Sequence, residues 1–189
     1  AHHYDIGNSF YEAWLDPTMT YSSAVFDSES DDLTTAQLNK YKRLADLADI
    51  QPGDKVLEIG CGWGGFATYV SEQIGAHVTG ITISEAQLAY AQSRLADAGL
   101  DDRVDLKLMD YRDLQGRFDK IVSIEMFEAV GQAYWPTYFA TVARMLKTGG
   151  RAVIQSITID HDAFQSYRDQ PDFIQRYIFP GGMLPSMPM

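Results

Sequence analysis

Short apolar runs alternate along the chain with longer segments in which apolar residues recur every three or four positions. The first pattern is typical of buried strands and the second of amphipathic helices. Strands are predicted at residues 55–60, 76–84, 103–110, 118–126 and 151–159, and helices at residues 32–50, 66–74, 84–99 and 134–150. This alternation predicts an α/β fold with a mostly parallel sheet and helices on both faces.

Several residues are expected to set the faces and ends of these helices. The spacing in residues 32–50 places on one helical face Leu38, Tyr41, Leu44, Leu47 and Ala48. Ser84 is a suitable N-cap for the helix at 84–99, and Gly99 is a suitable stop. Gly149 and Gly150 are expected to end the helix at 134–150.

Ligands of parallel sheets bind beyond the carboxyl ends of the strands, so the loop after the first predicted strand is the first place to search. This loop contains Gly60, Gly62 and Gly65 in the spacing G-x-G-x-x-G, which is typical of dinucleotide sites but also occurs in simple tight turns. A dinucleotide site also needs an acidic residue at the end of the second strand, to hold the ribose. That end carries Thr82 and Ser84 instead, which disfavours NAD.

Acidic residues beside the glycine loop favour a different adenosine compound. Glu58 precedes the first glycine by two positions, where it would repel a pyrophosphate. The same carboxylate suits S-adenosylmethionine (SAM), whose ammonium and sulfonium groups are cationic. Asp110 follows the third predicted strand, as is usual in SAM-dependent methyltransferases. The sequence therefore predicts a Rossmann-like class I methyltransferase that binds SAM.

Composition narrows the possible partners. The 189 residues carry a net charge of −11, which disfavours nucleic acid and repels anionic lipid at long range. One cysteine excludes an internal disulfide and favours a reducing, cytoplasmic compartment, and four scattered histidines show no metal-ligand spacing. No apolar run approaches the roughly 18–20 residues that span a bilayer, and no signal peptide opens the chain. Both ends read as cut, so we expect a chain truncated at its C-terminus.

Six blocks of sequence, in order, carry a resemblance to a known family. They read HYDIGNSFYEAWLDPTMTYSSAVF, VLEIGCGWGG, GITISEAQ, DYRDL, FDKIVSIEMFEAVG and YIFPGGMLPS. In order and spacing they resemble the cyclopropane-fatty-acyl-phospholipid synthases, which include the mycolic acid cyclopropane synthases. The resemblance implies methyl transfer from SAM to the cis double bond of a phospholipid acyl chain, through a carbocation. It also implies peripheral contact with the inner face of the membrane and is compatible with a homo-oligomer.

The resemblance further implies a division of the chain and a set of cofactor contacts. Residues 1–35 would form an N-terminal helix and lid, residues 36–159 a SAM-binding core, and residues 160–189 the start of an acyl-binding insertion. The cofactor would be held by Tyr21, Ser22, Glu58, Gly60, Cys61, Gly62, Trp63, Gly64, Thr82, Ser84, Gln87, Asp110, Tyr111, Arg112 and Ile124.

Proton removal is assigned, by the same resemblance, to a bound bicarbonate ion. Its cradle would consist of Ser23, Glu128, Gln155 and Ile157, with a tyrosine beyond Met189. The family carries cysteine at the position of Ser23 and histidine at those of Ala129 and Gln155, so the cradle is altered. The combination resembles an actinobacterial branch that makes methyl-branched fatty acids, and the choice between cyclopropane and methyl branch stays open.

Several residues admit two interpretations. Glu125 and Glu128 follow a buried strand, where a carboxylate is either an exposed helix cap or an active-site acid, and the resemblance favours Glu128. Cys61 fits a small buried residue better than a nucleophile because no histidine is placed to activate it. The apolar segment 164–182 is either a wall of an acyl tunnel or a helix docked on the core. A non-catalytic SAM-binding module and a methyltransferase for another small molecule remain alternatives.

Overall fold

A computed structural model of the chain describes residues 7–188, so His3, Tyr4 and Asp5 of the first sequence block lie outside the described residues. The elements in chain order are α1 (Asn8–Glu12), α2 (Leu33–Ala48), β1 (Lys55–Ile59), α3 (Gly65–Gln73), β2 (His77–Thr82), α4 (Glu85–Asp97), β3 (Val104–Leu108), β4 (Phe118–Ile124), α5 (Trp135–Met145), β5 (Leu146–Gln155) and α6 (His161–Asp169). Short 3-10 turns lie at Tyr111–Asp113, Phe127–Ala129 and Gln132–Tyr134, and a π-helical turn at Ile174–Ile178.

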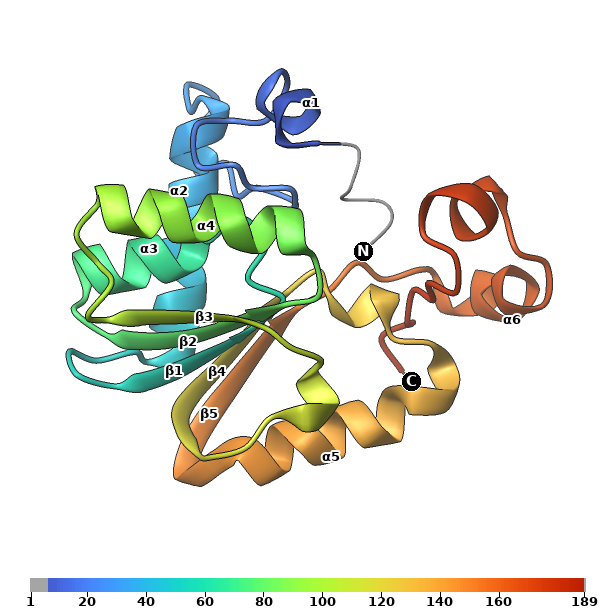
Figure 1. Ribbon diagram of the computed structural model, residues 1–189. Coiled ribbons are helices and arrows are strands. Elements are labelled where there is room, and N and C mark those ends of the chain that lie inside the picture. Colours follow the sequence, from blue (N-terminus) through green and yellow to red (C-terminus); the bar gives the residue numbers. More distant parts are fainter. Residues whose placement is uncertain (1–6, 189) are drawn as a thin grey trace.

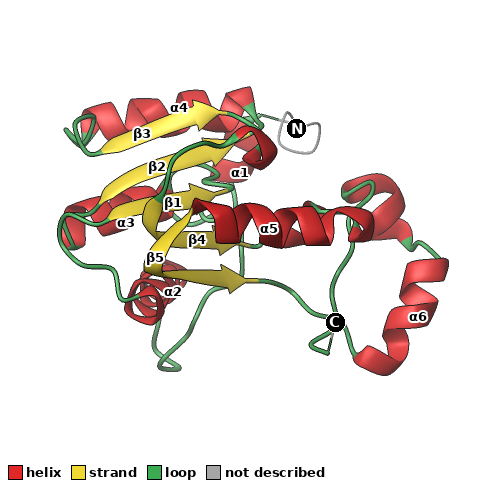
Figure 2. Ribbon diagram, turned by 90° about the horizontal axis from the view of Figure 1, so that it is seen from below, coloured by secondary structure: helices red, strands yellow, loops and turns green. Residues whose placement is uncertain are grey.

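The five strands form one parallel sheet in the order β3-β2-β1-β4-β5. Helices α2, α3 and α4 cover one face of this sheet and α5 covers the other (Figures 1 and 2). In Figure 2 the strand arrowheads point toward the side on which α6 lies. The strand order reverses between β1 and β4, and a crevice at such a point is the usual ligand site of open α/β sheets. The predicted fold class is confirmed.

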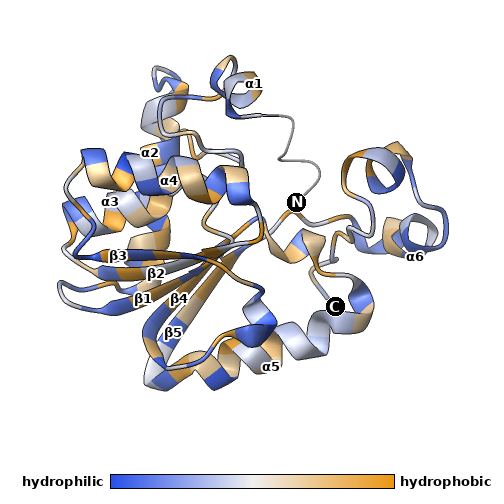
Figure 3. Cartoon of the chain, viewed as in Figure 1, coloured by the Kyte–Doolittle hydropathy of each residue, from blue (hydrophilic) through white to orange (hydrophobic). Residues whose placement is uncertain are grey.

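Alternating side chains of the strands supply two separate cores. On β1, Val56 packs in the core shared with α2, α3 and α4, whereas Leu57 and Ile59 pack in the core shared with α5. Figure 3 shows the resulting concentration of apolar residues along the strands, between more polar outer helix faces. Burial on both faces is the reason why the strands read as continuous apolar runs in the sequence.

The buried face of α2 differs from the predicted one. Leu38 and Leu47 are 39% and 55% exposed, whereas Gln37 and Lys40 are buried. Polar partners explain this orientation, because the Gln37 amide donates to the Ser22 carbonyl at 2.9 Å and Lys40 Nζ lies 2.6 Å from Ser22 Oγ. The prediction is confirmed for Tyr41, Leu44 and Ala48, which are buried, and wrong for Leu38 and Leu47. It failed there because it ranked positions by apolar character, whereas hydrogen bonds to a distant segment help to orient this helix.

The boundary between α5 and β5 also differs from the prediction. The helix ends at Met145 rather than at the glycine pair, and β5 covers residues 146–155 rather than 151–159. Leu146 already pairs with Phe118 of β4, and Lys147 Nζ bonds both carboxylate oxygens of Asp119 at 2.8 Å. These contacts extend the chain before the glycines, and Gly149 then lies within the irregular start of the strand, with φ of 78°. By contrast, the expected cap of α4 is present, since Ser84 Oγ accepts the Gln87 N–H at 3.3 Å.

The glycine loop between β1 and α3 requires its glycines for two reasons. Gly60, Gly62 and Gly64 have φ of 86°, 53° and 82°, in the left-handed region where a side chain is unfavourable. Gly65 has ordinary φ, but a Cβ there would collide with the hydroxyl of Tyr41, which bonds Thr20 Oγ1. The loop therefore packs directly against α2 and the segment that precedes it.

This contact predicts the effect of Gly65→Ala. We expect a loss of about 1–3 kcal/mol in the free energy of unfolding, because the methyl group must displace the buried Tyr41 hydroxyl. Urea denaturation measures it, and Gly131→Ala serves as the matched control, since the nearest atom to a Cβ there is 3.8 Å away. Combining Gly65→Ala with Tyr41→Phe should recover part of the loss, and equal destabilisation by the single and double changes would contradict the assignment.

Candidate active site

A cavity of about 510 Å³ lies at the carboxyl ends of the strands, where the loops after β1, β2, β3 and β4 converge. Except for Gly64 and Ser84, all the residues predicted to bind the cofactor line this cavity. Gly64 is instead the N-cap of α3, and Ser84 is a buried N-cap of α4. The structure thus brings together side chains from five separate loops and helix ends, as the parallel sheet requires.

Glu58 gives one end of this cavity its chemistry. The side chain is buried, and within residues 7–188 its Oε2 atom has no hydrogen-bond partner. Burial raises the pKa of Glu58 well above its ordinary value. A buried carboxylate with an unused acceptor favours a cationic group in the cavity and opposes a phosphate. The cavity therefore fits the amino-acid end of SAM, and the carboxylate does not fit the pyrophosphate of a dinucleotide.

The other end of the cavity carries polar side chains from the second and third strand ends. Thr82 Oγ1 donates to Gln87 Oε1 at 3.0 Å, which fixes the amide of Gln87 at the wall. Arg112 pairs with Asp110 at 2.7 Å, and this hydrogen-bonded partner lowers the pKa of the Asp110 carboxyl. Tyr111 lines the cavity between them. Hydrogen-bonding groups and an aromatic ring are suitable partners for a ribose and a purine.

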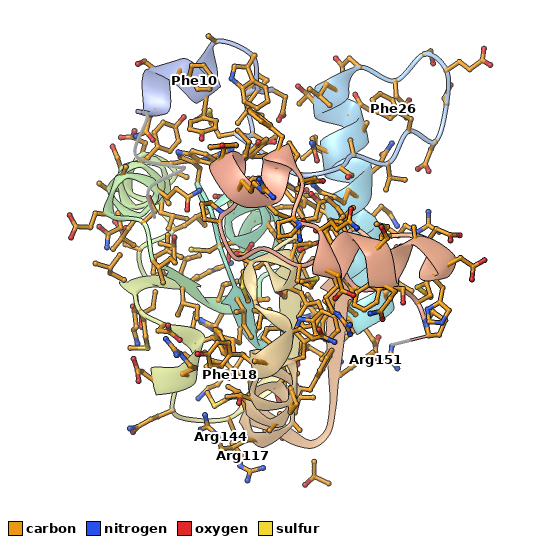
Figure 4. The ribbon with its side chains drawn as sticks, turned by 90° about the vertical axis from the view of Figure 1, so that its right-hand side faces the viewer. Phe10, Phe26, Arg117, Phe118, Arg144 and Arg151 are labelled. Atoms are coloured by element: carbon orange, nitrogen blue, oxygen red, sulfur yellow. The ribbon has the colours of Figure 1, made fainter. Side chains whose placement is uncertain are left out.

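Residues 19–23, which we call the covering segment, lie over the glycine loop. Tyr11 of α1 connects the two, since its ring centroid is 4.8 Å from that of Trp63 and 5.6 Å from that of Tyr21. Trp63 also donates from its indole nitrogen to Asn8 Oδ1 at 2.8 Å. In Figure 4, Phe10 of α1 and Phe26 lie at the end of the molecule opposite Arg117 and Arg144. The N-terminal segments therefore close one side of the cavity.

A second cavity, of about 550 Å³, adjoins the first. Its walls are largely apolar side chains from the N-terminal segments and from the chain after β5, namely Trp14, Leu15, Leu33, Ile157, Ile174, Phe179, Met183 and Leu184. The two cavities share the lining residues Thr20, Tyr21, Ser22, Glu125 and Ala129. A polar compartment and an apolar compartment thus meet at the covering segment and the loop after β4.

The segment after β5 was predicted to be either a helix docked on the core or a wall of a tunnel, and the structure shows features of both. Phe164 of α6 is buried in the core, 6.4 Å from Trp135 between ring centroids. Tyr167, Ile174 and Phe179 line the second cavity. Part of the segment is therefore docked on the core and part of it forms a wall of the apolar compartment. Figure 4, which looks onto this side, shows α6 and the π-helical turn in front of the sheet.

The four predicted catalytic residues are brought close together, around two carboxylates. The Ser23 N–H and the Gln155 amide each donate to Oε1 of Glu125 at 2.9 Å. The Ile157 N–H donates to Oε1 of Glu128, whose pKa is raised by burial. Ser23, Glu128 and Ile157 line the second cavity, and Gln155 lines neither cavity but reaches them through Glu125.

Two functional candidates were missed or ranked too low by sequence reasoning. Lys40 of α2 is 1% exposed, and burial lowers its pKa to about 8, against the opposing charges of Glu125, Asp16 and Glu58. Its one sequence signal is a lysine directly beside the apolar helical positions Tyr41 and Leu44. Glu125 was considered as an active-site acid, but the family resemblance favoured Glu128 for that role. Burial raises the pKa of the Cys61 thiol well above its ordinary value, which agrees with a small packing residue and disfavours a nucleophile.

Comparison with known proteins identifies the family. The family model described as mycolic acid cyclopropane synthetase matches residues 1–189, the whole chain. The chain belongs to this family. It is 44% identical, over 98% of its length, to the tuberculostearic acid methyltransferase UfaA1 of Mycobacterium tuberculosis, and 43% identical, over 98%, to the cyclopropane-fatty-acyl-phospholipid synthase of Escherichia coli K12. It covers 45% and 46% of those two proteins, so the chain spans about half the length of the curated relatives it matches.

Solved structures of the synthetase family agree with the fold. The mycolic acid cyclopropane synthase CmaA1, complexed with S-adenosylhomocysteine and CTAB, superposes with a TM-score of 0.91 at 31% identity, covering 100% of this chain and 69% of that one. S-adenosylhomocysteine is what SAM becomes when its methyl group is transferred. The methyltransferase class and its cofactor, both expected from the sequence, are confirmed for the family. Among the described residues, no helix has the length and apolar character needed to cross a membrane.

Lys40 provides a test of the buried charge at this site. Burial lowers the pKa of Lys40 from 10.5 to about 8 in the folded chain. Between these two pH values the unfolded chain binds more protons than the folded chain, so the free energy of unfolding rises with pH. Relative to a Lys40→Met variant, the wild-type chain should gain about 3 kcal/mol as the pH rises from about 7 to about 11. Urea denaturation at each pH measures the gain. Lys42→Met removes an exposed lysine as the control and should show no such trend.

Proposed function

We propose that the protein transfers the methyl group of SAM to the cis double bond of an unsaturated phospholipid acyl chain, through a carbocation. The product is a cyclopropane or a methylene that is later reduced to a methyl branch. One observation carries this proposal: a polar cavity and an apolar cavity meet at shared residues, which include Tyr21 and Glu125. Transfer between a charged nucleoside and a hydrocarbon requires such a pair of adjoining compartments.

The polar cavity would hold SAM, which supplies an electrophilic methyl group when bound. Glu58 would face its cationic amino-acid end, and Gly60 and Gly62 allow close approach of the backbone. Gln87 and the loop at Asp110–Arg112 would hold the ribose and adenine. An alkene is a weak nucleophile, so the enzyme must hold the double bond in line with the methyl group of SAM. The glycine loop and the covering segment would hold SAM in the orientation that this alignment requires.

The apolar cavity would hold the acyl chain and exclude water, which would otherwise quench the cation. Trp14, Tyr21 and Phe179 line it and present aromatic side chains, whose faces stabilise positive charge. A phospholipid substrate also implies contact with a membrane surface. We place this contact on the side where the chain after β5 forms the cavity wall.

The product depends on how fast a proton leaves the cation. The family resemblance implies a bicarbonate ion, held by Ser23, Gln155, Ile157 and Glu128, as the proton acceptor. Gln155 cannot carry positive charge, and neutral hydrogen bonds are about half as strong as charge-assisted ones. With bicarbonate as the base, slower proton removal would give time for a hydride shift and favour the methylene over the cyclopropane.

Product analysis with the full-length protein tests the proposed function. We expect methyl-labelled SAM to label the acyl chains of dioleoyl phospholipid vesicles, and mass spectrometry after release of the acyl chains distinguishes methylene from cyclopropane. Distearoyl phospholipid, which lacks a double bond, is the control and should remain unlabelled. Label appearing in a water-soluble acceptor, or in neither lipid, would contradict the proposal.

Cofactor binding should move a proton at Glu58. Its pKa is raised by burial, and a cationic ligand beside the carboxylate should lower that pKa, so that binding releases a proton in the pH range where the free site is protonated. Calorimetry of SAM binding in two buffers of different ionisation enthalpy measures the proton release. Glu58→Gln should abolish the release and weaken binding at least tenfold, whereas NAD should not bind to either protein. Proton release that persists in the variant would assign it to another group.

A further inference from the structure

Glu125 lies at the boundary between the two cavities, in a backbone conformation that glutamate rarely adopts. It follows β4 directly, its φ is 46°, and its N–H donates to the Gln155 carbonyl at 2.9 Å. A side chain in this left-handed region costs about 1 kcal/mol or more. Such strain persists where the surroundings fix the residue, and it occurs often at functional sites.

Hydrogen bonds hold one oxygen of the Glu125 carboxylate and leave the other available. Both the Ser23 N–H and the Gln155 amide donate to Oε1 at 2.9 Å. Within residues 7–188, the second oxygen, Oε2, has no hydrogen-bond partner. These two donors belong to the four residues expected to bind an external anion. The carboxylate of Glu125 therefore already occupies donors that such an anion would need.

The charge of Glu125 has a compensating partner. Lys40 is buried beneath the covering segment and is bonded through Nζ to Ser22 Oγ at 2.6 Å. Among the carboxylates whose charges raise the pKa of Lys40 against the effect of burial, Glu125 has the largest effect. Glu125 is partly buried, and a carboxylate in such a position is stabilised by a cation or by hydrogen-bond donors. Glu125 has two donors and a nearby cation, so an anionic group is supported at the point where the two cavities meet.

We propose, on the basis of the proposed function, that the carboxylate of Glu125 is the catalytic base in place of the bicarbonate ion that the family resemblance implies, and that no bound bicarbonate is needed. After methyl transfer, one C–H bond of the new methyl group breaks and the proton passes to Oε2 of Glu125. The electron pair left behind closes the third C–C bond of a cyclopropane. If a hydride has first shifted to the neighbouring carbon, the pair forms the C=C bond of a methylene. Glu125 becomes neutral and later returns its proton to water.

Glu128 is less suitable for this step, although it is the other carboxylate in the loop after β4. It lines only the apolar cavity, whereas Glu125 lines both. Its Oε1 accepts the Ile157 N–H, and its backbone carbonyl accepts the Met183 N–H at 2.8 Å. Its other carboxylate oxygen, Oε2, is buried and has no hydrogen-bond partner among residues 7–188, but Glu128 does not line the polar cavity. Through Oε1 and its carbonyl, Glu128 connects the segments that form the wall of the apolar cavity, which is a positioning role.

The experiment compares the full-length wild-type protein with Glu125→Gln and Glu125→Gly. Binding of ¹³C-labelled bicarbonate is followed by NMR without lipid, SAM affinity by calorimetry, and turnover in bicarbonate-free buffer. We expect the wild type to bind no bicarbonate and to remain active without it. Glu125→Gln should keep SAM affinity within a few-fold and lose roughly 10²–10⁴ in turnover, as expected for a lost base.

The glycine variant is the matched test, because glycine suits the φ of 46° and leaves the Ser23 and Gln155 donors free. It should bind ¹³C-bicarbonate and lose activity, and bicarbonate or formate should restore activity to it but not to Glu125→Gln. Bicarbonate binding or dependence in the wild type, or full turnover of Glu125→Gln, would overturn the proposal. Loss of SAM affinity matching the loss of turnover would make Glu125 a positioning residue instead.

The same readouts separate this inference from the proposed function. A wild-type protein that methylates no unsaturated lipid would contradict the proposed function, and with it the role of Glu125 as base. Bicarbonate binding by the glycine variant alone would still show that the Glu125 carboxylate occupies the anion position.

Discussion

The ammonium group of Lys40 is buried beneath the covering segment, with Glu125, Asp16 and Glu58 near enough for their charges to oppose the effect of burial on its pKa. One helix of the SAM-binding core is thereby connected to Ser22 of the covering segment by a hydrogen bond and to both candidate functional carboxylates by charge. Lys40, Asp16 and Glu58 are buried and Glu125 is partly buried, and charges of opposite sign cost less to bury together than alone. The charge of Lys40 therefore helps to stabilise Glu58 and Glu125 close to each other, and these two carboxylates have different proposed roles.

Glu58 and Glu125 differ in the cavities that they face. Glu58 faces only the cavity suited to the nucleoside, and its unpartnered oxygen suits a cationic ligand. Glu125 faces both cavities, with one oxygen held by donors from Ser23 and Gln155. In the proposed reaction Glu58 would face a bound cation and Glu125 would accept a proton from a hydrocarbon, and these two roles require contact with different cavities. The structure separates the two carboxylates by placing Glu58 near the end of β1 and Glu125 directly after β4.

The apolar compartment depends on segments distant from each other in the chain. Trp14 and Leu33 reach it from the N-terminal side, and Ile174 and Leu184 from the segment after β5. The sheet alone provides no such space, since both of its faces are covered by helices (Figures 1 and 2). The architecture is therefore that of an α/β core with a polar cavity, beside which the N-terminal segments and the segment after β5 form an apolar cavity.

The sequence by itself determined the α/β class, the five strands and most residues of the nucleoside cavity. It could do so because strands buried on both faces read as apolar runs, and because ligand residues of a parallel sheet follow its strands directly. Only the tertiary structure decided the buried face of α2, the start of β5 and the placement of Glu125. Each depends on partners far away in the chain: Ser22 for Lys40, Phe118 for Leu146, and Ser23 with Gln155 for Glu125. Local periodicity carries no information about such pairs, because their hydrogen bonds exist only after the sheet brings the segments together.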